Sequence, residues 1–148
     1  MRRVILFSIL VSLVVSFSAS AQVYNAKFVC GKPDPEIKAF AFASGLYYTS
    51  INVHANNTVD LRKRFSVALM DEKYGDVSDW VSETLPAGRS MQIDCGNIYS
   101  HLGIPVGTFI DGFVTIVGGP LDVIGVYTVD GNSGAGVSSI HTERVPPS

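Results

Sequence analysis

Cysteine, histidine and tryptophan are scarce in this 148-residue chain, which contains two, three and one of them. The two cysteines, Cys30 and Cys95, form no CxxC pair and have no nearby histidine, so their spacing does not support a metal site. In an oxidising compartment such a pair is expected to form a disulfide, which would close a loop of 65 residues. The alternative is a pair of buried free thiols.

The sequence also lacks a recognisable catalytic constellation. No serine stands in a GxSxG nucleophile elbow, and "GNSGAG" around Ser133 is predicted to be a solvated turn. There is no glycine-rich phosphate loop with a lysine. The stretches "DEKYGD" and "DGNSG" lack the ordered acidic ligands and the final glutamate of a calcium loop. We therefore expect no catalytic residue, no metal and no cofactor, and a protein that is not an enzyme.

Charged residues make up only 16% of the chain, and positive charge is the scarcer sign. Without Arg2 and Arg3, residues 22–148 hold nine basic residues against thirteen acidic ones, a net charge of −4. Proteins that bind nucleic acid neutralise phosphates with a basic surface. This balance argues against nucleic acid as the main partner.

The N-terminus has the pattern of a secretory signal peptide over residues 1–21. Two arginines precede the apolar run "VILFSILVSLVVSF", and "ASA" at residues 19–21 offers small residues for cleavage before Gln22. An uncleaved membrane anchor is the alternative, although the run is short for a spanning helix. We expect a periplasmic or secreted protein with one domain, residues 22–148, and no membrane span after cleavage.

Residues 22–148 have the composition of β-strands, with valine, isoleucine, tyrosine, phenylalanine and threonine between turns of glycine, asparagine, aspartate and proline. The pattern predicts an all-β fold, a single antiparallel β-sandwich of about seven strands, with strands over residues 23–30, 46–55, 58–69, 89–95, two within 109–129, and 137–145. Asn56 and Asn57 predict a tight turn that pairs the second strand with the third. Asn97 and Gly103 predict the start and end of one helical turn.

Residues 70–88 show no sustained period and are predicted to be one long irregular loop. We expect four of its side chains to hold it against the sandwich: Tyr74, Val77, Trp80 and Leu85.

Four aromatic and two basic residues form a possible partner surface, namely Tyr47, Tyr48, Tyr74, Trp80, Arg62 and Arg64. Amphipathic rings and arginines are enriched at interfaces. The alternatives are that the rings close the ends of the core and that the arginines are the solvated side of a strand. Lys63 tests the strand register, because strict alternation places it among inward apolar residues. We expect either a bulge at Lys63 or an ammonium that reaches the rim toward an acid.

The motifs "KFVCG", "YYTSINVH", "LRKRFSVAL", "IDC", "GFVTI", "LDVIGVYT" and "ERVPP", in this order, resemble a family of small exported prokaryotic proteins of unassigned function. The resemblance covers nearly all of residues 22–148 and implies a Cys30–Cys95 disulfide, since that family has the same two cysteine motifs. That family usually has Asn-Pro in the hairpin turn where this chain has Ala55-Asn56, so the turn type is expected to differ. In layout, the chain is also similar to the β-sandwich of the sensory rhodopsin transducer family. Neither resemblance supplies functional residues.

These observations favour an exported, non-enzymatic protein that acts by binding a protein partner or by self-association. One alternative is a small carbohydrate-binding or hydrolytic module that uses the tyrosines, the tryptophan and the acids of residues 71–83. Another is a membrane-attached accessory protein.

Overall fold

The computed structural model describes residues 21–34, 45–69, 73–131 and 137–148, with the backbone alone for 137–141. The predicted signal peptide, apart from Ala21, lies outside the described residues, and so does the turn around Ser133. Within the described part of the chain, no helix is long and apolar enough to cross a membrane.

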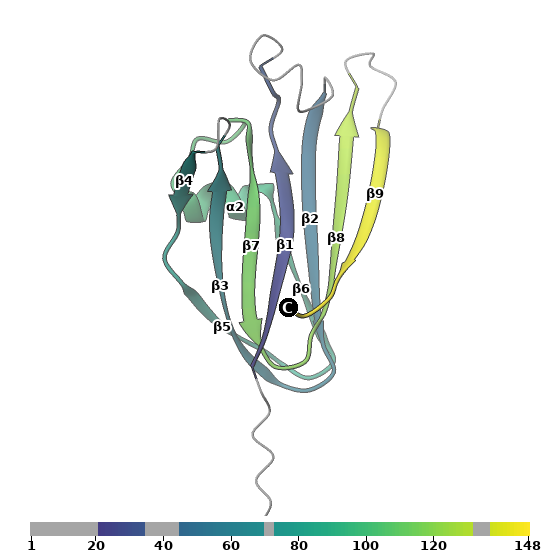
Figure 1. Ribbon diagram of the computed structural model, residues 1–148. Helices are drawn as coiled ribbons and strands as arrows, with labels where there is room; N and C mark the ends of the chain where they lie inside the picture. Colours follow the sequence, from purple (N-terminus) through teal and green to yellow (C-terminus); the bar gives the residue numbers. More distant parts are fainter. Residues whose placement is uncertain (1–20, 35–44, 70–72, 132–136) are drawn as a thin grey trace, which may run out of the picture.

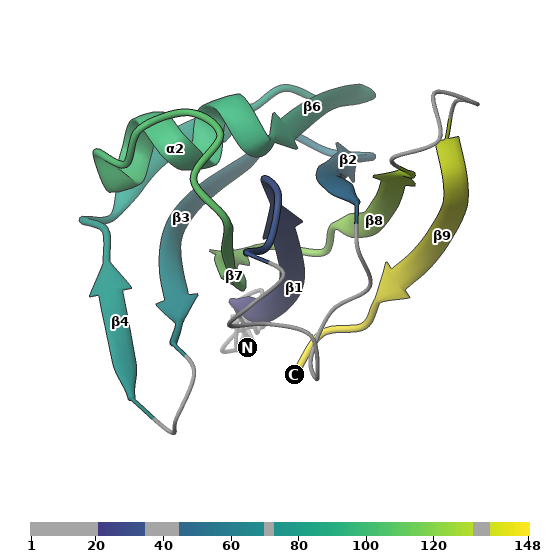
Figure 2. The same cartoon turned by 90° about the horizontal axis from the view of Figure 1, so that it is seen from above.

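Two antiparallel sheets make up the fold, which confirms the all-β prediction (Figures 1 and 2). Sheet A has the order β1-β7-β3-β4, and β5 also pairs with β3. Its strands are β1 (Gln22–Cys30), β3 (Val59–Ala68), β4 (Tyr74–Val77), β5 (Val81–Leu85) and β7 (Ile110–Gly118). Sheet B has the order β6-β2-β8-β9, with β2 (Leu46–Ala55), β6 (Arg89–Asp94), β8 (Asp122–Asp130) and β9 (Val137–Val145). A short helix, α2 (Cys95–Leu102), follows β6.

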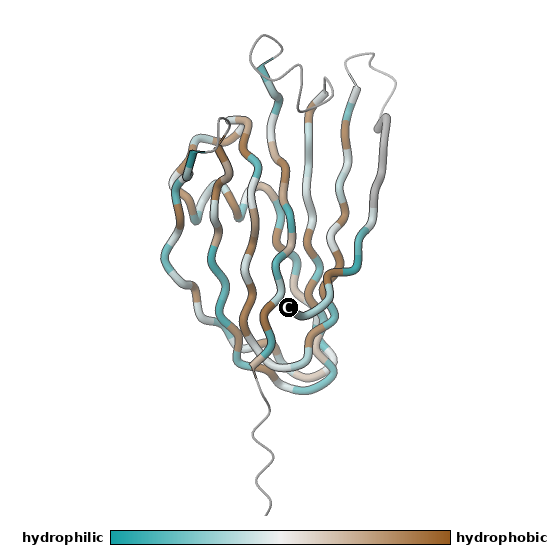
Figure 3. The backbone as a smooth tube through the Cα atoms, in the orientation of Figure 1, coloured by the Kyte–Doolittle hydropathy of each residue, from teal (hydrophilic) through white to brown (hydrophobic). Residues whose placement is uncertain are grey.

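The core lies between the sheets and is built from alternate residues of their strands. Along β3, Val59, Leu61 and Phe65 are buried whereas Arg62 and Arg64 are exposed. Hydropathy alternates in the same way along the strands in Figure 3. Period-two patterning thus assigned the faces of β3 correctly, as it did for β2, where Ile51 and Val53 are fully buried.

The prediction of one long irregular loop over residues 70–88 is wrong, because this segment contains β4 and β5. The seven predicted strands are all present, and these two short ones bring the number within the described ranges to nine. Of the predicted anchors only Leu85 is buried; Tyr74 is 98% exposed, Val77 58% and Trp80 37%. The segment is held by pairing with β3 rather than by apolar packing, and four- and five-residue strands are too short to show a period in the sequence.

The predicted hairpin between β2 and β3 is wrong, because the two strands belong to different sheets. β2 pairs with β6 and β8, whereas β3 pairs with β7, β4 and β5. The turn at Asn56 and Asn57 therefore crosses from one sheet to the other, so that both strands present their apolar faces to one core. The "GGP" connection does the same between β7 and β8.

The helix α2 begins one turn earlier than predicted. Asp94 is the N-cap: its carboxylate accepts from the Asn97 backbone N–H at 2.9 Å, and the Asn97 side chain accepts from the Asp94 N–H at 3.0 Å. Asn97 is thus the third helical residue of a capping box and not the cap. Gly103 ends the helix as predicted, in the left-handed conformation with φ 66°.

Lys63 lies on the inward face of β3, as alternation requires. The residue is 8% exposed, and its Nζ donates to Oε2 of Glu83 on β5 at 2.6 Å. The second of the two expected solutions is therefore correct: the ammonium reaches an acid at the rim. The register shift in β3 falls between Ser66 and Ala68, opposite β4, and not at Lys63.

Candidate functional site

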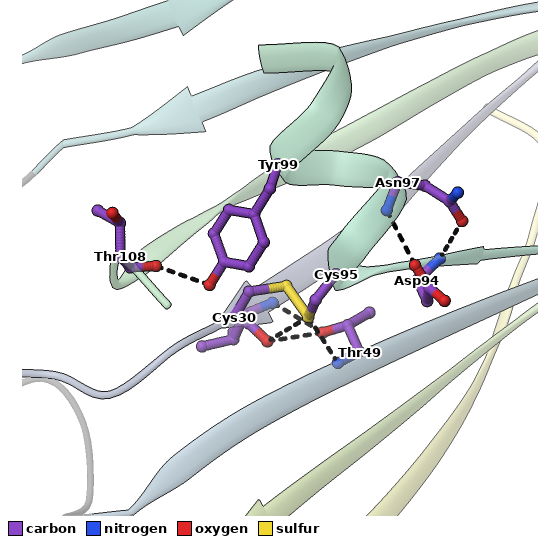
Figure 4. Close-up of a disulfide and its surroundings, with 8 residues drawn as sticks. Cys30, Thr49, Asp94, Cys95, Asn97, Tyr99 and Thr108 are labelled. Carbon is purple, nitrogen blue, oxygen red and sulfur yellow. Dashed lines mark hydrogen bonds between the residues drawn. A yellow bond between two sulfur atoms is a disulfide. The ribbon is translucent and has the colours of Figure 1, made fainter. Parts of the chain in front are cut away.

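The disulfide predicted from the sequence is present and fixes one corner of the sandwich (Figure 4). It joins Cys30, the last residue of β1 in sheet A, to Cys95, the first residue of α2 after sheet B, with 5.7 Å between the Cα atoms. The bond fits an oxidising extracellular compartment.

Thr49 fastens β1 to β2 beside the disulfide. Its hydroxyl donates to the Val29 carbonyl at 2.8 Å and accepts from the Val29 N–H at 2.9 Å, although the two strands belong to different sheets. Gly31 and Tyr47 exchange two backbone hydrogen bonds of 3.0 and 2.9 Å one step further along. The corner is therefore held by a covalent bond and by four hydrogen bonds across the sheets.

Tyr99 of α2 ties the helix to the connection that leads into β7. Its hydroxyl donates to the Thr108 carbonyl at 2.7 Å, and the ring is almost fully buried. Burial raises the pKa of Tyr99 above its ordinary value, while a hydrogen bond from the Gly107 backbone acts in the opposite direction. The phenol thus stays protonated and serves as a structural clamp.

A groove of about 500 Å³ opens next to this corner. Its walls come from β2, β8, the end of β6, the first turn of α2 and the connection after the helix; they include Tyr47, Tyr48, Ser50, Gln92, Asp94 and Val106. Tyr48 and Val106 are 48% and 82% exposed, so apolar surface is open to solvent at the edge of the groove.

The lining of the groove combines the half-exposed Tyr48 ring with hydroxyl groups and the side-chain amide of Gln92. The Gln92 side-chain amide donates to the Ser50 hydroxyl at 2.8 Å, which leaves the Gln92 carbonyl oxygen available to a ligand. Asp94 is the one carboxylate among the described residues that line it.

The six residues of the predicted partner surface fall in three separate places. Tyr47 and Tyr48 line the groove, where the Tyr47 ring meets Phe109 edge to face at 6.1 Å. Tyr74 lies on β4, at the edge of sheet A. Arg62, Arg64 and Trp80 gather on the outer face of sheet A, where both guanidinium groups lie over the indole ring at 4.6 and 4.7 Å.

Alternation places Ser50 on the same face of β2 as Tyr48, but sequence reasoning missed Gln92 and Asp94 as their neighbours. The outward positions of these two residues on β6 also follow from alternation, but their meeting with β2 depends on the register that pairs Ser50 with Asp94 and Asn52 with Gln92. No local signal in either strand specifies that pairing. Among the described residues, no group of three or more histidine, cysteine or acidic side chains is placed to hold a metal ion.

No protein-family model and no curated protein matches this chain. A solved structure, the crystal structure of Thermotoga maritima 1070, is similar to it with a TM-score of 0.49 and 11% sequence identity. The match covers 86% of this chain and 93% of that one. At this level the likeness supports no inference about function, and the family resemblances drawn from the motifs stay predictions.

Proposed function

We propose that this chain is an exported binding protein that acts without catalysis, and that the groove beside the disulfide is its ligand surface. The observation that carries the proposal is the combination of a half-exposed Tyr48 ring with Ser50, Gln92 and Asp94 in one open groove. The signal-peptide pattern of residues 1–21 and the Cys30–Cys95 bond support export.

The chemistry of the groove favours a carbohydrate as the ligand. An amphipathic ring packs against the apolar face of a sugar, while amide, carboxylate and hydroxyl oxygens take its hydroxyl groups. The walls belong to paired strands and a capped helix that the disulfide anchors, so the site is formed before the ligand arrives. Such preorganisation lowers the entropy lost on binding.

A glycan array with the oxidised protein tests this function, followed by calorimetry on each glycan that binds. Tyr48→Ala and Gln92→Ala should each weaken binding about tenfold or more, which corresponds to about 1.4 kcal/mol. Asn52→Ala is the matched control, since Asn52 is exposed on the same face of β2 but does not line the groove. Binding that ignores Tyr48→Ala would remove the groove from the proposal, and release of reducing sugar from a bound glycan would contradict the absence of catalysis.

A second candidate function, self-association, is favoured by the edge of sheet A. β4 is a short edge strand that exposes Tyr74 and Val77, and unguarded apolar edges invite pairing with another strand. Light scattering coupled to gel filtration should then detect a dimer that Val77→Lys dissociates. Val106→Lys, which places the same charge at an exposed valine away from β4, should leave the dimer intact. A monomer at all concentrations would exclude this candidate.

A further inference from the structure

The outer face of sheet A carries a cluster that the groove does not explain: Arg62, Arg64 and Trp80, here called the Arg-Trp-Arg cluster. Arg62 and Arg64 are two residues apart on β3, so their side chains leave the same face about 7 Å from each other. Both are exposed, and both guanidinium carbons lie within 5 Å of the centre of the Trp80 ring, at 4.6 and 4.7 Å.

The position of Trp80 is fixed by the backbone on both sides of it. Before it, the Ser78 N–H donates to the Phe65 carbonyl at 2.9 Å and the Ser78 hydroxyl accepts from the Phe65 N–H at 3.0 Å. After it, β5 pairs with β3, with Val81 opposite Lys63 and Ser82 opposite Arg62. The indole therefore stays over β3 and restricts the rotamers of two arginines that would otherwise move freely.

Three acids of sheet A have partners other than the two arginines. Asp60 accepts from the Thr84 hydroxyl at 2.6 Å, Glu83 pairs with Lys63 at 2.6 Å, and Asp111 pairs with Lys27 at 2.6 Å. Among the residues that the structure describes, neither Arg62 nor Arg64 forms an ion pair. Two like charges are thus held side by side with no carboxylate of the described segments in ion-pair contact, an arrangement that an added anion would stabilise.

We propose that the Arg-Trp-Arg cluster binds an acidic polysaccharide. Each guanidinium offers a planar fork of N–H donors that matches a carboxylate or sulfate in two parallel hydrogen bonds. Two forks on one strand take two acidic groups of an extended chain. Trp80 is a positioning residue that holds the forks in place.

The geometry disfavours the other common polyanions. Single-stranded nucleic acid is bound along a positively charged groove with several stacking rings, whereas this face offers two arginines and the one ring that they contact. Anionic membranes are recognised by clusters of about four to eight basic residues, whereas this cluster contains two. A flexible glycan with widely spaced acidic groups can place one group at each of the two positioned arginines.

Binding of a polyuronate and of a sulfated dextran to the full oxidised protein tests the proposal, with uncharged dextran as the negative control. The double variant Arg62→Ala/Arg64→Ala should lose at least about tenfold in affinity, and increasing NaCl from about 50 to about 500 mM should weaken wild-type binding severalfold. Arg89→Ala is the matched control, because it removes an exposed arginine from β6 in sheet B and leaves the cluster intact. Tyr48→Ala should not alter this binding, which separates it from the groove.

Two further measurements keep the test decisive. Arg62→Lys/Arg64→Lys keeps the charge but not the planar fork, and should still lose severalfold. Trp80→Phe should retain more affinity than Trp80→Ala, with melting temperatures recorded to confirm folding. The proposal is overturned if neither polysaccharide binds, if Arg89→Ala is as damaging as the double variant, or if anionic vesicles or single-stranded DNA bind more tightly than the polysaccharides.

Discussion

Thr49 and Lys63 are the two residues that are classed as polar or charged and buried in the part of the chain that the structure describes, and they lie in contrasting parts of the sandwich. Thr49 is 3% exposed at the disulfide corner, where its hydroxyl both donates to and accepts from the backbone of Val29. Lys63 is 8% exposed near the edge of sheet A, and its ion-pair partner, Glu83, has a side chain that is 44% exposed.

The difference shows two ways to place a polar group in an apolar interior. The Thr49 hydroxyl is satisfied entirely by protein atoms at a corner that cannot open while the disulfide holds. The Lys63 ammonium depends on a half-exposed partner carried by a five-residue strand. We therefore expect the corner to contribute far more to the free energy of unfolding than the edge does.

Removing the disulfide should have the largest effect. Cys30→Ala/Cys95→Ala releases a cross-link with a sequence separation of 65 residues, and the chain-entropy relation puts the loss at about 4 kcal/mol. Urea unfolding of the double variant and of the oxidised protein measures it. A loss below about 1 kcal/mol would contradict the view that the corner depends on this bond.

Thr49→Val is expected to rank second. The valine has nearly the same shape but leaves the Val29 N–H and carbonyl without their partner, which costs about 2 kcal/mol. Thr49→Ser keeps the hydroxyl and should recover most of the loss. Equal destabilisation by valine and serine would mean that packing, and not hydrogen bonding, makes Thr49 important.

At the edge, the two partners of the Lys63–Glu83 pair should behave unequally. Glu83→Ala leaves the buried ammonium without its carboxylate and should cost about 1 kcal/mol, a value limited by the exposure of Glu83. Lys63→Met removes the charge and keeps the volume, so it should change stability by less than about 0.5 kcal/mol. The same unfolding assay compares them, and a more damaging Lys63→Met would show that the ion pair itself stabilises the edge.

Tyr127 lies on β8 beside β9, at a third boundary of the core, and its phenol makes the free energy of unfolding depend on pH. Burial first, and the nearby charge of Glu143 second, raise the pKa of Tyr127 from its ordinary value of 10 to about 12. Between these values the unfolded chain releases the phenol proton while the folded protein retains it, so the free energy of unfolding falls as the pH rises. At neutral pH the phenol is protonated in both states and the effect is absent, so there it is the smallest of the four.

Urea unfolding at about pH 9 and about pH 11, with Tyr127→Phe alongside, measures that contribution. Wild type should lose more stability across this interval than the variant, which has no phenol to titrate. Identical losses would show that Tyr127 titrates alike in the folded and unfolded states.

The faces of the long strands could be predicted from the sequence because alternation is a local property. The burial of Ile51, the exposure of Arg62 and the inward position of Lys63 all follow from it. The pairing of the strands could not be predicted in the same way. Turn residues such as Asn56 and Asn57 can connect two paired strands or two strands in different sheets. Here the shared core selects the crossing between sheets.

The candidate groove could not be predicted from the sequence for a related reason. Tyr47 and Tyr48 were recognised as aromatic, but Gln92 and Asp94 are more than forty positions away and become their neighbours through the β2–β6 register. The stacking of Trp80 on two arginines likewise required β5, a strand too short to be detected by period.

The pairing of β1 with β7 has a kinetic consequence. In this pairing Gln22 lies opposite Gly118 and Cys30 opposite Ile110, and β2 pairs with β6 and β8. The first two strands therefore have no partner close in sequence. Topologies dominated by such distant pairings fold slowly, on the order of milliseconds to seconds, because loop closure precedes any stabilising contact. Strand β1 can therefore pair only once residues 110–118 are available, so it lacks its sheet partner during most of synthesis.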